Sequence, residues 1–218
     1  MDPELKSVHK NMIKIGLGAL AHASWHANYS SYENDCWPEL SVLQAAHAAE
    51  LLIKARIAQE HPLLIFEHTP KHLSDNENRL GYRRLVAEGR TFQYSDLPNR
   101  LWATTGIKLK EQELFIEFGK LRNSIQHFSP PESKSLSQIT LEFIFGVIDP
   151  FIHQTWNLFA IDYNEDPEPY QYFVPSIISR EILFLVSPDS IENFQYMDIS
   201  WPENSDYNIE MQSRIEKA

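Results

Sequence analysis

The fold can be derived outward from residues 114–128, Leu114-Phe-Ile-Glu-Phe-Gly-Lys-Leu-Arg-Asn-Ser-Ile-Gln-His-Phe128. Apolar side chains recur there at intervals of three and four residues, the spacing of one buried helix face: Leu114, Phe118, Leu121, Ile125 and Phe128. The same stretch carries Arg122, a permanent cation, and His127, the residue type best suited to proton transfer near neutral pH. Pro130 and Pro131 predict that the helix ends shortly afterwards. We therefore expect a core-facing helix that carries two polar groups with a role of their own.

The rest of the chain up to residue 160 also has helical patterns, which predicts an all-α, up-and-down bundle. Asp96 is a candidate N-cap, Pro98 suits the first turn after it, and Pro150 predicts a bend. Ser135 or Ser137 is expected to cap the helix that contains Pro150. The predicted helices cover residues 4–27, 38–60, 80–88, 97–104, 110–128 and 135–159.

The C-terminal part differs from the bundle in composition. Residues 132–218 hold 15 acidic and 4 basic side chains, so they account for almost all of the net charge of −11. Residues 182–186 and 194–199 have the composition of strands without a clean alternation, which fits either a small β structure or a short buried helix with an extended tail. We expect residues 1–160 to form the helical bundle and residues 161–218 to form an acidic extension packed on it, irregular or β-containing, with a terminal helix.

Composition excludes several classes of protein. A chain of 218 residues with 43% hydrophobic side chains is expected to be globular. No signal peptide and no membrane-spanning window are recognised, and the single Cys36 excludes an intramolecular disulfide, so we expect a cytoplasmic protein that does not enter the membrane. No nucleotide-binding loop or cysteine cluster occurs, so no cofactor is expected. His22 and His26 have metal-ligand spacing, but no third ligand lies near them in sequence; we expect structural histidines and no metal.

Two groups of charges leave alternatives open. The middle of the chain, residues 71–131, holds 10 basic and 7 acidic side chains, which fits either a local basic patch or solvated helix faces. Glu50 and Lys54 lie one turn apart on an otherwise apolar helix. They form either an ordinary surface ion pair or the polar lining of a cleft.

Arg122 and His127 together suffice for one kind of chemistry. A histidine can deprotonate a ribose 2′-hydroxyl or protonate a leaving 5′-oxygen, and an arginine can stabilise charge on a phosphoryl group. Metal-independent cleavage of RNA needs both roles. The alternative is structural: Arg122 pairs with a carboxylate such as Glu50, and His127 stabilises the helix C-terminus. The residue types alone do not decide between the two.

The segment Arg122-Asn-Ser-Ile-Gln-His127 resembles the Arg-x4–6-His motif of the HEPN superfamily, the higher eukaryotes and prokaryotes nucleotide-binding domains. The segment Ala49-Glu50-Leu-Leu-Ile-Lys54-Ala-Arg56 is similar to the Glu-x3-Lys element of that family's second helix. The resemblance covers roughly residues 5–160. It implies an up-and-down helical bundle that dimerises so that two Arg/His pairs form one composite cleft.

The resemblance also implies an activity and partners. The activity is metal-independent endoribonuclease cleavage, which leaves a 2′,3′-cyclic phosphate and a 5′-hydroxyl, in a toxin or a defence-system effector with an antitoxin or other regulatory protein as partner. His127 would transfer protons, Arg122 would stabilise the transition state, and Asn123 would orient the phosphate. Glu50 and Lys54 would organise the cleft. The alternative is a non-catalytic HEPN module that binds nucleotide, RNA or a partner protein.

Helix geometry limits how Arg122 and His127 can act together. Five residues at about 100° each place Arg122 and His127 roughly 140° apart around a regular helix. For both to reach one phosphate, either the last turn of the helix is distorted or a second subunit completes the pair.

Overall fold

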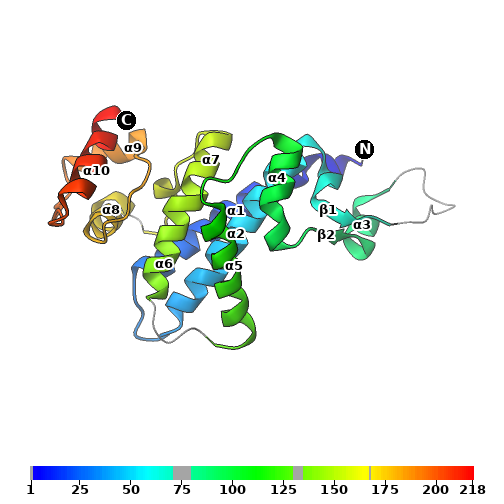
Figure 1. Cartoon of the computed structure of the whole chain (residues 1–218), viewed down its shortest axis with the longest axis horizontal. Coiled ribbons are helices and arrows are strands. Elements are labelled where there is room, and N and C mark those ends of the chain that lie inside the picture. The colour runs from blue at the N-terminus through cyan, green and yellow to red at the C-terminus, as the bar shows by residue number, and fades with distance from the viewer. Residues whose placement is uncertain (1, 71–79, 130–134, 167) are drawn as a thin grey trace. The chain divides into compact units, whose positions relative to one another are not determined.

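The computed structural model describes residues 2–70, 80–129, 135–166 and 168–218, and it is mostly helical (Figure 1). The all-α class is therefore confirmed. Within these ranges, no helix combines the length and the apolar character needed to cross a bilayer. The α-helices are α1 (Pro3–Asn28), α2 (Trp37–Glu60), α3 (Tyr82–Glu88), α4 (Leu97–Thr105), α5 (Gln112–His127), α6 (Leu136–Phe143), α7 (Asp149–Trp156), α8 (Pro169–Ser179), α9 (Pro188–Phe194) and α10 (Ser205–Lys217). Shorter elements are η1 (Pro62–Ile65), η2 (Tyr94–Asp96), the π segment η3 (Ile144–Ile148), η4 (Ala160–Asp162), β1 (Phe66–His68) and β2 (Arg90–Thr91).

The chain forms two compact units, and each is described by itself. The first unit contains residues Met1–Gly16 and Glu50–Leu109, and the second contains Leu17–Ala49 and Lys110–Ala218. Residues 161–218 thus belong to the second unit together with α5, α6 and α7. The expected domain boundary at residue 160 stays a prediction.

The first unit contains a small sheet that the sequence patterns do not predict. Strands β1 and β2 pair antiparallel, with Phe66 opposite Thr91 and an irregularity before His68. Gly89 caps the C-terminal end of helix α3: its N–H donates to the Leu85 carbonyl oxygen at 2.8 Å, and β2 begins at the next residue. A Cβ at Gly89 would lie 2.4 Å from that oxygen and 2.9 Å from the Phe66 ring. The absence of a side chain at Gly89 is therefore what lets the chain pass from α3 into the sheet.

The second unit is built around a helical run from Leu136 to Trp156. As predicted, Ser135 caps its start: the side-chain oxygen accepts from the Gln138 N–H at 3.3 Å. Where a bend was expected at Pro150, the run contains the five-residue π segment η3, in which the Asp149 N–H donates to the Ile144 carbonyl oxygen. Proline has no N–H and its ring crowds the carbonyl oxygen four residues earlier. A wider turn directly before Pro150 keeps the helix continuous despite both effects.

Helix α5 packs antiparallel against this run (Figure 1). The Phe118 ring stacks on Phe143 with centroids 3.8 Å apart, while the Leu114 side chain lies 3.7 Å from the position of a Cβ on Gly146. The buried residues of α5 are Phe115, Phe118 and Gly119. The predicted buried stripe is wrong at its last member, since Phe128 is 90% exposed, while Leu121 and Ile125 are half-buried. Periodicity identifies apolar side chains, but it does not say how far along a helix its neighbours extend. Pro130 and Pro131 lie outside the described residues.

The C-terminal part is helical and irregular, so of the two alternatives left open for it the β-containing one is wrong, while the terminal helix is present as α10. The described residues of the range 161–218 contain no strand. Residues 182–187 are extended and largely buried, but side chains bind their backbone groups instead of a neighbouring strand. The Leu185 N–H donates to Asp149 Oδ2 at 2.8 Å, the Phe184 carbonyl oxygen accepts from Arg214 at 3.1 Å, and the Ile182 carbonyl oxygen accepts from the Tyr207 hydroxyl at 3.0 Å. Buried backbone groups need partners, and here long-range side chains supply them.

Candidate functional site

The predicted catalytic residues lie in the second half of α5. Arg122 is half-buried, and its Nη1 donates to Asn123 Oδ1 at 3.0 Å and to Gln126 Oε1 at 3.3 Å. Asn123 is exposed, and His127 is the exposed last residue of the helix. The α-helix is unbroken from Gln112 to His127, so no distortion of its last turn turns His127 toward Arg122. Of the two ways to bring the pair onto one phosphate, a distorted last turn is not observed. Completion by a second copy stays a prediction.

Phe128, which directly follows His127, is a functional candidate that sequence reasoning placed in the core. Its N–H donates to the Ser124 carbonyl oxygen at 2.8 Å, and Ser124 Oγ donates to the Ser129 carbonyl oxygen at 3.0 Å. These bonds hold the turn, while the ring is 90% exposed. An exposed aromatic ring beside a histidine is a surface on which a nucleic-acid base can stack.

A polar cavity of about 520 Å³ lies at the same end of the second unit. Ser135 and Ser137, at the start of α6, line it, and α6 starts at the end where the antiparallel α5 stops. Further lining residues come from the connection between α1 and α2 and from the residue after α8, among them Asn28, Asp35, Trp37 and Arg180. We call this the Arg180 cavity.

Arg180 is the cation of this cavity. It is half-buried, and this burial lowers the pKa of its guanidinium from the ordinary value. Its Nη2 donates to the Asn28 carbonyl oxygen at a long 3.5 Å, and no carboxylate in the described part of the chain pairs with it. Asp35 also lines this cavity, but it does not pair with Arg180. A guanidinium that is partly removed from water and forms no ion pair is suited to an anionic ligand such as a phosphate.

Glu50 and Lys54 lie in the first unit, whereas Arg122, Asn123 and His127 lie in the second. Lys54 is only 5% exposed, and its Nζ donates to Glu50 Oε1 at 2.6 Å and to Thr91 Oγ1 at 3.0 Å. The pair is therefore not an ordinary surface ion pair: it holds β2 against α2. Its predicted role in a catalytic cleft stays a prediction.

His22 and His26 have separate partners. His22 Nδ1 lies 3.0 Å from Glu165 Oε1, and His26 Nδ1 lies 2.8 Å from Gln44 Oε1, with its ring 4.8 Å from that of Trp37. Across the described ranges, no group of three His, Cys, Asp or Glu side chains is placed to hold a metal ion. These contacts agree with the structural role that we expected for both histidines.

Asp149 is a buried carboxyl outside the candidate site. Burial raises its pKa to about 7, against the opposing effect of two backbone N–H donors, those of Ala160 and Leu185, each at 2.8 Å. The side chain is fully buried and bonded to backbone on both oxygens, so it holds η4 and the extended segment 182–187 on α7. Its position predicts a structural role.

The candidate site thus consists of Arg122, Asn123, His127 and Phe128 from the end of α5. The Arg180 cavity is a separate candidate, because none of these four residues lines it. Comparison of the chain with models of protein families, with curated proteins and with solved structures finds no match.

Proposed function

We propose that the chain is a metal-independent endoribonuclease of HEPN type that acts as a dimer. The observation that carries the proposal is the position of the Arg-x4-His residues: Arg122, Asn123 and His127 lie on one helix end with access to solvent, beside the exposed ring of Phe128. A motif that served only packing would be expected to face the core.

The proposed reaction transfers the phosphoryl group within the RNA chain. His127 accepts the proton of a ribose 2′-hydroxyl, whose oxygen then forms a bond to the adjacent phosphorus. The bond from phosphorus to the 5′-oxygen breaks, and this oxygen takes a proton from the His127 of a second copy. The products are a 2′,3′-cyclic phosphate and a 5′-hydroxyl. Arg122 stabilises the charge that develops on the phosphoryl oxygens, and Asn123 orients the phosphate.

The geometry of α5 supports the proposed dimer. In an unbroken helix Arg122 and His127 point roughly 140° apart, so one copy does not direct both at the same phosphate. Phe128 and the Arg180 cavity extend the site, because a base can stack on the ring and a neighbouring phosphate can bind the guanidinium. By its resemblance to HEPN proteins, we assign the enzyme to a toxin or defence system, with an antitoxin or other regulatory protein as partner.

The test is cleavage of single-stranded RNA by the purified full chain in the presence of EDTA. We expect His127→Ala and Arg122→Ala to reduce the cleavage rate at least about 100-fold, the usual contribution of a proton-transferring or charge-stabilising group. His22→Ala, which removes a half-exposed histidine outside the motif, is the matched control and should leave the rate unchanged. RNA with a 2′-deoxyribose at the cleaved position should remain intact.

Two results would contradict the proposal: absence of cleavage by the wild-type chain on any RNA tested, or equal cleavage by the wild type and both α5 variants. A second function is favoured by one observation, that the Arg122 guanidinium is bonded by Asn123 and Gln126 of its own helix. The chain would then be a non-catalytic module that binds RNA, nucleotide or a partner protein. RNA binding without cleavage, weakened in Arg122→Ala, would identify that alternative.

A further inference from the structure

The Arg180 cavity can be considered apart from the residues proposed for RNA cleavage. Its volume of about 520 Å³ is in the range of small-molecule sites, and all of its lining residues belong to the second unit. Because none of the four candidate residues of α5 lines it, an inference about its ligand does not depend on the proposed ribonuclease activity.

The guanidinium of Arg180 offers hydrogen-bond donors to this cavity. Its Nη2 donates to the Asn28 carbonyl oxygen at 3.5 Å, and Asn28 lines the same cavity, so the guanidinium lies at the cavity wall. Among the described residues it makes no other hydrogen bond and no ion pair. A guanidinium carries N–H groups on three nitrogens. Most of these donors are therefore left for a ligand.

Two carboxylates close to Arg180 in the sequence or in the cavity have other partners. Glu181 directly follows Arg180, but its Oε2 accepts from Asn204 Nδ2 at 2.7 Å. Asp35 lines the cavity and is exposed, and its Oδ1 accepts from the Cys36 thiol at 3.7 Å, a residue that does not line the cavity. Because neither carboxylate pairs with Arg180, the charge of the guanidinium is available to an anion.

The rest of the wall supplies hydroxyl groups and two aromatic residues. The serines that line the cavity are Ser30, Ser31, Ser135 and Ser137. Tyr29 and Trp37 also line it, and neighbours hold both rings: the Tyr29 ring lies 4.4 Å from that of Trp25, and the Trp37 ring lies 4.8 Å from that of His26. Hydroxyl groups can donate to phosphoryl oxygens, and aromatic rings held in place can pack against a planar ligand.

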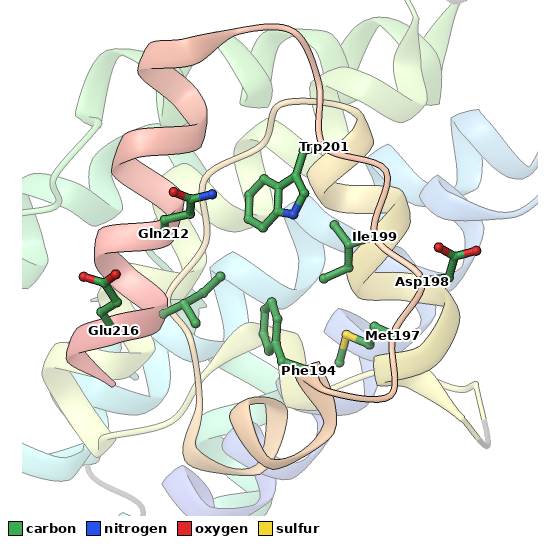
Figure 2. Close-up of a pocket in the computed structure, with 8 residues that line it drawn as sticks. Phe194, Met197, Asp198, Ile199, Trp201, Gln212 and Glu216 are labelled. Carbon is green, nitrogen blue, oxygen red and sulfur yellow. The ribbon is translucent and has the colours of Figure 1, made fainter.

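Another cavity of similar volume in the second unit has the opposite charge. It also measures about 520 Å³ and lies between the end of α9, the segment 195–204 and α10 (Figure 2). Its charged lining residues are Asp198 and Glu216, and neither Lys nor Arg lines it. Figure 2 shows both carboxylates at the outer edges, away from the rings of Trp201 and Phe194. A phosphate would be repelled there, so of these two cavities the Arg180 cavity is the one suited to it.

We propose that the Arg180 cavity binds a phosphate ester with an aromatic body. The phosphoryl oxygens accept from the N–H groups of Arg180, whose planar fork matches two oxygens of one phosphate, and from the serine hydroxyls. The aromatic body packs against Tyr29 and Trp37. A free aromatic phosphate and a nucleotide within an RNA strand share this chemistry, so the experiment has to distinguish the two sources.

The experiment measures binding to the full chain by isothermal titration calorimetry. Adenosine 5′-monophosphate (AMP) is the free ester, adenosine the same body without phosphate, inorganic phosphate the anion without a body, and 2′-O-methylated ApA an uncleavable piece of an RNA strand. We expect AMP to bind at least about tenfold more tightly than adenosine or inorganic phosphate, because a hydrogen bond to a charged group adds to the aromatic contact. Equal binding of ApA and AMP would identify an RNA strand as a source of the ligand, and binding of AMP without ApA would identify a free ester.

The variants locate the bound phosphate. Arg180→Gln should weaken AMP binding at least about tenfold and leave adenosine binding unchanged, while Arg180→Lys, which keeps the charge but not the fork, should weaken AMP binding less. Arg83→Gln, at an exposed arginine of the first unit, is the matched control and should change neither affinity.

Asp35→Asn tests the charge of the cavity at an exposed residue, where a change puts folding at little risk. It removes a repelling carboxylate, so AMP binding should become about twofold to fivefold tighter. The proposal would be overturned by AMP binding no more tightly than adenosine, by equal effects of Arg180→Gln and Arg83→Gln, or by AMP binding in Asp35→Asn that is unchanged or weaker.

Discussion

Asp149 joins segments that are distant in sequence through a single side chain. Its two oxygens accept from the Ala160 and Leu185 N–H groups, so one carboxylate satisfies two buried donors that no helix or sheet serves. A buried donor without a partner destabilises a fold by more than a made hydrogen bond stabilises it. The free energy of unfolding should therefore depend strongly on this residue, although it lies outside every proposed ligand site.

The first residue-scale prediction concerns Asp149→Asn. An amide keeps the shape of the carboxyl group, but its NH2 group has no lone pair with which to accept from a backbone N–H, whereas both oxygens of a carboxyl group can accept even when it is protonated, as Asp149 is at pH 5. We expect the free energy of unfolding to fall by about 1–3 kcal/mol, the usual effect of an unsatisfied buried donor. This change in the free energy of unfolding is measured by urea denaturation at pH 5, with circular dichroism as the signal. Glu203→Gln, at an exposed carboxylate, is the control and should shift the midpoint little.

The second residue-scale prediction concerns pH. Burial raises the pKa of Asp149 to about 7, above the value of about 4 in an unfolded chain, so the native state binds this proton more tightly. The stability that Asp149 contributes is then fully present below about pH 4 and is lost as the pH rises through about 7. The difference in free energy of unfolding between wild type and Asp149→Asn should narrow from pH 5 to pH 8, because the amide does not titrate. A difference that widens with pH would contradict this.

At the scale of elements, sequence patterns predicted helices well and their surroundings poorly. Helices α1, α2, α4 and α5 begin and end close to the predicted residues, because periodicity and prolines are local signals. Of the two predicted helix caps, one is confirmed. Ser135 caps α6, whereas the Asp96 side chain makes no capping hydrogen bond at α4. The extended segment 182–187 was read as a possible strand because its composition is apolar. Its backbone partners lie on α7 and α10, and such long-range pairings leave no local signal.

The element-scale prediction compares two glycines. Gly89→Ala should lower the free energy of unfolding by about 1–3 kcal/mol, since the new Cβ would lie 2.4 Å from the Leu85 carbonyl oxygen, where only a backbone shift can relieve the overlap. Gly18→Ala is the matched control: Gly18 lies in α1 with nothing within 4 Å of the new methyl group. This second change should raise stability by about 0.5–1 kcal/mol through helix propensity. The test is to compare the thermal unfolding midpoints of both variants with that of the wild type. A midpoint shift of the same sign in both variants would contradict the role assigned to Gly89.

At the scale of the whole molecule, charge limits the proposed binding of RNA. The net charge of −11 repels a polyanion, so binding must rely on the few cations placed at the site. Which cations these are was only partly predictable. Arg122 and His127 were found because they share one helix and have a recognisable spacing. Arg180 was not, because its role depends on neighbours 40 or more positions away and on a cavity, neither of which a local pattern encodes.

The whole-molecule prediction concerns salt. In His127→Ala, which should bind without cutting, the logarithm of the association constant for a short single-stranded RNA should fall linearly with the logarithm of salt concentration. Adding Arg180→Ala should reduce the steepness of this dependence by about one, the loss of one phosphate contact. Arg83→Ala removes an exposed arginine from the first unit and is the control; it should leave the slope unchanged. An unchanged slope in the Arg180 variant would remove this residue from the proposed site.

The π segment η3 has a consequence for the phase of the helical run that contains it. A π turn holds one residue more than an α turn, which rotates everything after it by about 100° around the axis. Phe143, before the segment, faces α5, whereas Asp149, directly after it, faces η4 and the extended segment 182–187. Because of this rotation, Asp149 faces a different direction from the one that a regular α-helix of the same sequence would give it. The same rotation means that the length of this segment, and not only its composition, determines whether α5 and the C-terminal part can be held by the same helix.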